Sequence, residues 1–125
     1  MVKSICYIIV SVLILIGGTI GEQIYLDKSF EELKTEVSII DEKIDDKTVT
    51  VNDLENLKNS WLKQKERLHT IIPHTEIKEI DLWVSEALAY AEIGKYDETK
   101  TKLTVIDQLF KQIPKIFKLR IENIF

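Results

Sequence analysis

Apolar residues recur every three or four positions along most of the chain, which is the spacing of one face of an α-helix. We call each such row a seam, and the chain contains four of them, separated by short polar stretches. The seams are Leu26, Phe30, Leu33, Val37, Ile40 and Ile44; Leu54, Leu57, Trp61, Leu68 and Ile72; Ile77, Ile80, Val84, Ala87 and Ala91; and Leu103, Ile106, Phe110, Ile113, Phe117, Ile121 and Ile124. No stretch shows the alternation typical of β-strands. The pattern predicts an all-α fold, an antiparallel bundle of about four helices.

The breaks between the first three seams contain residues that favour turns and helix starts. Residues 45–51 are polar and β-branched, and they predict the first turn. Thr50 or Asn52 is expected to cap the helix that follows, because their side chains can accept hydrogen bonds from free backbone N–H groups. Pro73 is expected to end the second helix, since the residue before a proline is disfavoured in the α region. Thr75 is predicted to cap the third helix.

The last seam is interrupted once and preceded by a glycine. Gly94 is expected to end the third helix in the left-handed conformation that glycine adopts without strain. The fourth helix is then predicted to start near Asp97. Pro114 leaves two interpretations open, one kinked helix or a separate final helix that begins at the proline.

An apolar run precedes the first seam. From Ser4 to Gly21 no residue is charged, and eighteen residues of helix span about 27 Å, enough for a thin bilayer core. We favour residues 1–21 as an uncleaved transmembrane anchor, followed by a helical-bundle domain at 22–125. A cleaved signal peptide is the alternative, because residues 19–21 include small residues at the positions that a signal peptidase recognises. No proline or glycine lies between Gly21 and the first seam, so the anchor is predicted to continue into that seam.

The charges that flank the apolar run predict its orientation. Lys3 and the amino terminus precede it, whereas Glu22, Asp27 and further acidic residues follow it. Basic residues next to a membrane segment stay in the cytoplasm. We therefore expect a single-pass protein of the cell membrane with a cytoplasmic N-terminus and an extracytoplasmic C-terminal domain.

Charge is unevenly distributed along the rest of the chain. The formal net charge is −4, but residues 22–56 hold 11 acidic and 4 basic side chains, and residues 100–125 hold 6 basic and 2 acidic ones. This balance argues against a nucleic-acid partner. The basic tail, with Lys115, Lys118 and Arg120, is a candidate contact for an acidic partner, for the acidic first helix or for anionic lipid. Its apolar side is also expected to close the bundle.

The inventory of reactive residues predicts no enzyme, no cofactor and no metal site. Cys6 is the single cysteine and lies inside the apolar run, which excludes an internal disulfide and a zinc cluster. His69 and His74 are five positions apart across a proline, so they do not share a helix face as a metal-binding pair would. Carboxylates surround the first turn without the glycine that a calcium loop requires. No acid–base pair or activated nucleophile can be recognised.

Two aromatic residues beside the third seam are candidates for partner contact. Trp83 and Tyr90 share a face of the predicted helix, which makes them either the edge of the core or a protein-contact patch, where Trp and Tyr are favoured. The sequence thus favours a protein-interaction or structural module whose partner is another protein or a second copy of the chain. The alternative is a sensor of a ligand, an ion or pH that uses the acidic first turn or the two histidines.

The chain also resembles a known family. The N-terminal apolar segment, Trp61 to Leu68 leading into Ile71-Ile72-Pro73-His74, the helix start at residues 76–80 and the closing Glu122-Asn123-Ile124 are similar to short proteins of clostridia and other endospore-forming bacteria. That family is known only as a domain of unknown function. The resemblance covers nearly the whole chain and implies membrane-anchored helical proteins without an assigned activity, so it supplies no catalytic residue.

Overall fold

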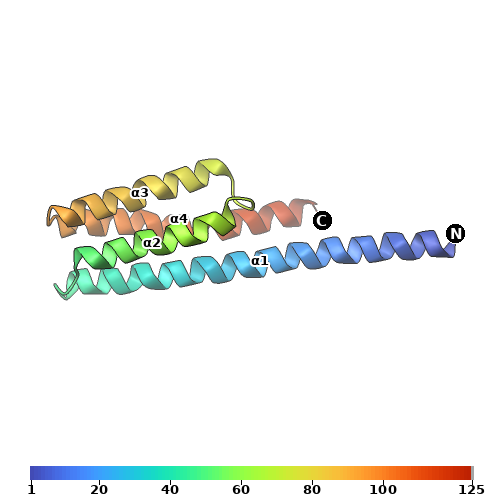
Figure 1. Ribbon diagram of the computed structural model, residues 1–125, viewed down its shortest axis with the longest axis horizontal. Helices are drawn as coiled ribbons and strands as arrows, with labels where there is room; N and C mark the ends of the chain where they lie inside the picture. Colours follow the sequence, from blue (N-terminus) through green and yellow to red (C-terminus); the bar gives the residue numbers. More distant parts are fainter. Residues whose placement is uncertain (125) are drawn as a thin grey trace.

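The protein is a bundle of antiparallel helices in the computed structural model (Figure 1). The structure describes residues 1–124, apart from the side chains of Ile121 and Ile124, so the end of the fourth seam lies outside the described residues. The helices are α1 (Val2–Asp45), α2 (Val51–Leu68), α3 (His74–Glu92) and α4 (Tyr96–Ile124). No strand occurs within residues 1–124. The predicted all-α fold is confirmed.

The helices form a ring in which each packs against two others. α1 contacts α2 and α4, and α3 contacts the same two helices. Because successive helices run in opposite directions, the α1–α2 and α3–α4 turns lie together at one end, the distal end. The α2–α3 turn and the end of α4 lie at the other end, called proximal, beside the place where α1 leaves the bundle (Figure 1).

The core consists of the predicted seams. All members of the first three seams are buried, and so are Leu103, Ile106, Phe110 and Ile113 of the fourth. The ring of Phe110 lies 5.6 Å from that of Phe30 and 6.2 Å from that of Trp61, measured between centroids. These three side chains join α4, α1 and α2 at the centre of the bundle. Trp61, only 1% exposed, is therefore a core residue.

The long helix α1 has two different halves. Its 44 residues form one unbroken helix, which confirms the predicted continuity of the apolar run with the first seam. The residues from Leu26 onward supply core side chains, whereas residues 1–18 are all exposed and project beyond the bundle (Figure 1). An 18-residue window of α1 has a mean hydropathy of 2.3 and no buried residue. This half has the length and composition of a membrane anchor or a signal sequence.

The first turn ends α1 with a left-handed residue. Lys47 has φ 60°, and the N–H of Thr48 donates to the carbonyl of Lys43 at 2.8 Å while that of Lys47 donates to Ile44 at 3.2 Å. This pair of hydrogen bonds is the Schellman motif, which satisfies the last carbonyls of a helix. A lysine thus occupies the position that usually holds glycine.

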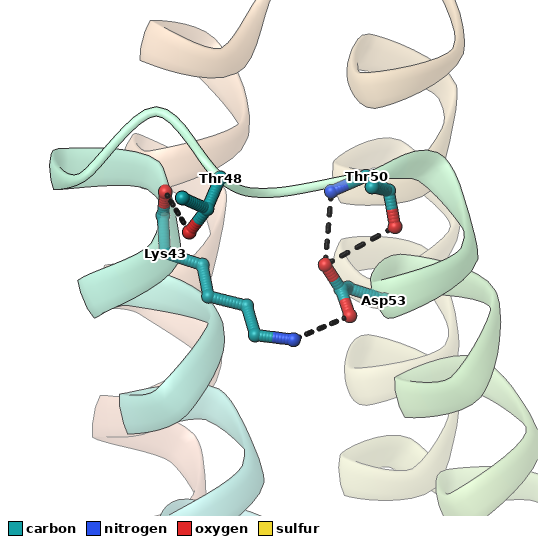
Figure 2. Close-up of polar contacts among 4 residues, drawn as sticks. All are labelled: Lys43, Thr48, Thr50 and Asp53. Carbon is teal, nitrogen blue, oxygen red and sulfur yellow. Dashed lines mark hydrogen bonds and ion pairs between the residues drawn. The ribbon is translucent and has the colours of Figure 1, made fainter.

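Thr50 then starts α2, as one of the two predicted caps. Figure 2 shows its backbone N–H donating to the carboxylate of Asp53, at 2.9 Å, and the ammonium of Lys43 donating to the other carboxylate oxygen, also at 2.9 Å. The hydrogen bond from Lys43 and those from Thr50 hold the pKa of Asp53 below its ordinary value. Asp53 therefore links the end of α1 to the start of α2.

The other turns follow the sequence with two exceptions. The first is that α2 ends at Leu68, ahead of Pro73 and of the seam residue Ile72, so Pro73 does not itself end the helix. Gly94 has φ 76° and ends α3 through hydrogen bonds from Gly94 N–H to Ala91 and from Lys95 N–H to Tyr90, as predicted. The predicted cap at Thr75 is wrong. Pro73 occupies the cap position of α3, and Thr75 lies inside the first turn, where its hydroxyl donates to the Glu76 carboxylate at 2.7 Å.

Pro114 lies inside one continuous α4, which settles the choice that the sequence left open. Its ring nitrogen has no hydrogen, so the carbonyl of Phe110 lacks its usual helical donor. Packing on both sides of the proline holds the helix together, because Phe110 and Ile113 are buried in the core and Phe117 packs against it.

Candidate functional site

The predicted contact residues on α3 form a defined cluster with α4. The ammonium of Lys102 lies 4.7 Å from the centroid of the Trp83 ring and 5.7 Å from that of Tyr90. The same ammonium pairs with the carboxylate of Glu86 at 3.2 Å. We call these four residues the α3/α4 clamp. Aromatic faces attract cations because of their negative electrostatic potential, so the clamp joins the outer sides of the two helices.

Trp83 in the clamp lies at the edge of the core. Its side chain is half-buried and packs against the core cluster, and Tyr90 is half-buried two turns further along the same face of α3. The structure thus brings together two of the five predicted contact residues and gives them an internal partner, Lys102. Their contact with a second protein stays a prediction, which concerns the ring surface left exposed.

The other three predicted contact residues lie at the proximal end of α4. Lys115, Lys118 and Arg120 are all exposed, and none of them takes part in an ion pair within residues 1–124. Ile113 is buried and Phe117 packs on the core, so the inner side of this segment closes the bundle as the sequence suggested. The outer side differs, because Ile116 is 41% and Leu119 58% exposed.

A shallow hollow opens beside this segment. Ile72 and Pro73 from the α2–α3 turn line one side, and Ile113, Ile116 and Phe117 line the other. Glu76 and Arg120 are the two charged residues of its lining. Its lining is therefore apolar between two opposite charges, and it belongs to the same proximal surface as the basic tail.

Charge complementarity between α1 and α4 is found nearer the distal end. The ammonium of Lys100 on α4 pairs with the carboxylate of Asp45 and lies 3.8 Å from that of Asp41. The hydrogen bond to Asp45 raises the pKa of Lys100. The acidic first helix thus attracts the start of α4 rather than the basic tail.

A polar contact between α2 and α3 was not foreseen from the sequence. Asp81 on α3 accepts hydrogen bonds from the indole of Trp61 and from the ammonium of Lys65, both at 2.6 Å. Lys65 interrupts the second seam, and that interruption was the available signal for an inward-facing partner. The contact fixes the pairing of the two helices.

The two histidines lie at the α2–α3 turn, at the opposite end of the bundle from the acidic first turn. His69 follows the end of α2, and its ring Nδ1 lies 2.6 Å from the carbonyl oxygen of Glu66 in the preceding turn. His74 is the exposed first residue of α3. Within residues 1–124, no group of three or more His, Cys, Asp or Glu side chains is arranged to hold a metal ion.

These features define the class as an all-α bundle whose first helix carries a candidate membrane segment. Comparison with known families identifies the chain more closely. The model of the family described as "Domain of unknown function (DUF4363)" matches residues 21–124, and the chain belongs to this family. The match confirms the resemblance to a family without a known function. No curated protein and no solved structure matches the chain.

Proposed function

We propose that the protein is a single-pass membrane protein whose bundle lies outside the cytoplasm and serves as a protein-interaction or structural module. The observation that supports the membrane location most directly is the exposed apolar half of α1. A core helix of comparable hydropathy would be buried, whereas the apolar window of α1 has no buried residue. Apolar patches of this extent on soluble proteins are rare, and they are covered by lipid or by another protein.

The orientation rests on the charges beside the apolar half. Lys3 and the amino terminus lie on one side, and Glu22 and Asp27 lie on the other. Positive charge is retained on the cytoplasmic side. The bundle is then extracytoplasmic, and its distal end, with the first turn, lies farthest from the membrane because α1 runs straight to it (Figure 1).

The module assignment rests on the α3/α4 clamp. Trp and Tyr are enriched where proteins bind one another, because their large rings bury much area at a small entropic cost. In the clamp, the ammonium of Lys102 lies over the rings of both Trp83 and Tyr90 and favours this arrangement. A surface fixed in advance loses less entropy on binding.

Topology is tested by cysteine accessibility in intact cells. In a Cys6→Ser background, Ile93→Cys places a thiol at the distal end, where Ile93 is 65% exposed. The matched variant Val2→Cys, at a position 76% exposed, places one at the start of α1. A membrane-impermeant maleimide should label Ile93→Cys on intact cells and Val2→Cys only after permeabilisation. The reverse pattern would show that the orientation is wrong.

Retention of the anchor is tested by the mass of the protein extracted from the membrane. An intact chain of 14.5 kDa supports the uncleaved anchor. A chain that lacks about the first 21 residues would instead identify a signal peptide.

The interaction role is tested by cross-linking the anchored protein in its own membrane. Trp83→Ala should reduce the yield of cross-linked partner while the helical circular dichroism is kept. Leu82→Ala is the matched control, since Leu82 neighbours Trp83 on α3 and is 54% exposed. Equal yields for the two variants would show that the clamp does not contact the partner. Loss of helicity in Trp83→Ala would show that Trp83 is needed for the fold.

A further inference from the structure

The pairing of α1 with α4 determines which residues of α1 lie opposite the basic last turns of α4, and we call this position along α1 the height of the tail. The ring of Phe110 packs on that of Phe30, and the ammonium of Lys100 reaches the carboxylates of Asp41 and Asp45. Antiparallel helices have the same rise per residue, so each step forward along α4 corresponds to one step back along α1. Lys118 and Arg120 then lie level with about Gln23 and Gly21.

Burial on α1 agrees with this height. Thr19 is the single half-buried residue among residues 1–22, and Gln23 is half-buried as well. Figure 1 shows the end of α4 alongside the blue N-terminal half of α1. The last turns of α4 therefore reach the place where the uncharged run of α1 ends, which is the expected border between the lipid headgroups and the hydrocarbon core.

The outer side of α4 has the residue types that suit this border. Ile116 and Leu119 are exposed apolar side chains, and Lys115, Lys118 and Arg120 flank them. Long cationic side chains can bury their methylene groups next to acyl chains while the charge reaches a phosphate. The apolar hollow between Pro73 and Ile116 faces the same level.

Contact between the α4 tail and lipid does not require a net positive charge at the proximal end. Glu22, Asp27 and Glu122 place negative charge at about the same height as the tail. The anchor holds the tail next to the lipid at all times, so docking pays no cost for bringing two molecules together. Local contacts of Leu119 with acyl chains and of the cations with phosphates are then sufficient.

We propose that the last turns of α4 dock in the headgroup layer of the bilayer that holds α1, with Lys115, Lys118 and Arg120 at phospholipid phosphates and Leu119 at the acyl chains. The occupant of this surface is the phospholipid itself. The proposal rests on the proposed membrane anchoring of α1 and adds a second, shallower contact with the same membrane.

The test measures depth with a fluorophore on single cysteines in the full-length protein. In a Cys6→Ser background, the variants are Leu119→Cys, Leu13→Cys in the anchor and Ile93→Cys at the distal end, at positions that are 58%, 61% and 65% exposed. The proteins are reconstituted into vesicles of phosphatidylcholine and phosphatidylglycerol that contain nitroxide-labelled acyl chains. Fluorescence at Leu119→Cys should be quenched clearly, most strongly by nitroxides near the headgroups, and that at Leu13→Cys most strongly by nitroxides deep in the acyl chains. Fluorescence at Ile93→Cys should not be quenched.

The outcomes separate the two proposals. Quenching at Leu13→Cys with none at Leu119→Cys would overturn the docking and leave the anchor in place. No quenching at Leu13→Cys would overturn both proposals. A third outcome is that Leu119→Cys is shielded from aqueous iodide but not quenched by lipid, and only at a high protein-to-lipid ratio. This result would show that a second copy of the chain covers this surface, and it would also overturn the docking.

The phosphate contacts are tested by removing the charges. A triple variant of the tail should lower the quenching at Leu119→Cys, whereas a triple variant of equal charge elsewhere should not. The tail variant is Lys115→Gln, Lys118→Gln and Arg120→Gln, and the control is Lys47→Gln, Lys58→Gln and Lys95→Gln. Equal quenching in both would overturn the role of the tail cations.

Discussion

The indole N–H of Trp61 donates a hydrogen bond of 2.6 Å to the carboxylate of Asp81. The indole ring belongs to the core, and the carboxylate also receives the ammonium of Lys65. One acidic side chain on α3 thus satisfies a buried donor and a charge from α2. Such a contact acts mainly on specificity, because a different pairing of the helices would leave the Trp61 N–H buried without an acceptor.

We expect Asp81→Ala to destabilise the bundle by about 1–3 kcal/mol, the cost of leaving a buried donor unsatisfied. Asp81→Asn keeps an acceptor for Trp61 and loses the ion pair with Lys65, so its effect should be smaller. Thermal unfolding of the detergent-solubilised chain, followed by circular dichroism, measures both. Equal losses in the two variants would contradict the role of the Trp61 hydrogen bond.

Lys47→Gly should stabilise the protein by about 1 kcal/mol, because a residue with a Cβ is strained in the left-handed region and glycine is not. Lys47 adopts this conformation at the end of α1. The control is Lys47→Ala, which removes the same charge and keeps the strain. A gain in both variants would assign the effect to charge instead of backbone conformation.

Glu36→Gln should stabilise the protein near neutral pH. Desolvation between α1 and α2 raises the pKa of Glu36, although a hydrogen bond with Ser60 partly opposes the shift. The ionised carboxylate is therefore disfavoured in the folded state, and this penalty is fully present above the folded pKa. It disappears as the pH falls below the ordinary glutamate pKa.

The melting temperature of Glu36→Gln should thus exceed that of the parent at about pH 7 and equal it at about pH 4. Glu32→Gln is the control, since Glu32 lies on the same helix and is exposed. A difference that stays constant across this range would show that the titration of Glu36 is not the cause.

Asp53→Asn should destabilise the protein near neutral pH, in contrast to Glu36→Gln. The lowered pKa of Asp53 means that its carboxylate stabilises the folded state at all pH values above its ordinary pKa, and that this contribution is lost as the pH falls through the folded pKa. We expect a loss of about 1 kcal/mol at neutral pH, the net contribution of a typical hydrogen bond. The difference from the parent should narrow in acid below about pH 3.

The control for Asp53→Asn is Glu55→Gln, which removes an exposed charge two residues further along α2. Urea unfolding at two pH values measures both variants. Equal losses for Asp53→Asn and Glu55→Gln would assign the effect to the charge of the first turn of α2 and not to the contacts of Asp53 with Lys43 and Thr50.

Much of the fold could be predicted because its signals are local. The seams follow from helix periodicity. The end of α3 at Gly94 follows from the left-handed conformation that glycine allows. Thr75 was predicted wrongly because a proline before a helix can itself take the cap position, as Pro73 does. Pro114 left a choice open because its outcome depends on the packing of Phe110 and Phe117, which are held by partners on other helices.

The candidate sites were less predictable, since they depend on residues far apart in the sequence. Trp83 and Tyr90 were identified from one helix, but their partner Lys102 comes from the next helix. The choice of Asp81 as the partner of Trp61 needs the pairing of α2 with α3, which periodicity does not determine. The height of Lys118 beside Gln23 likewise follows only from the register between α1 and α4.

The absence of a joint in α1 has a mechanical consequence in a bilayer. Membrane helices tilt by about 20° on average, and the angle changes with the thickness of the lipid. A straight helix transfers that angle to everything attached to it. Over the part of α1 that lies in the bundle, such a tilt would displace the distal turns sideways by roughly 12 Å. The reach of the distal surface toward its neighbours would therefore depend on how thick the surrounding membrane is.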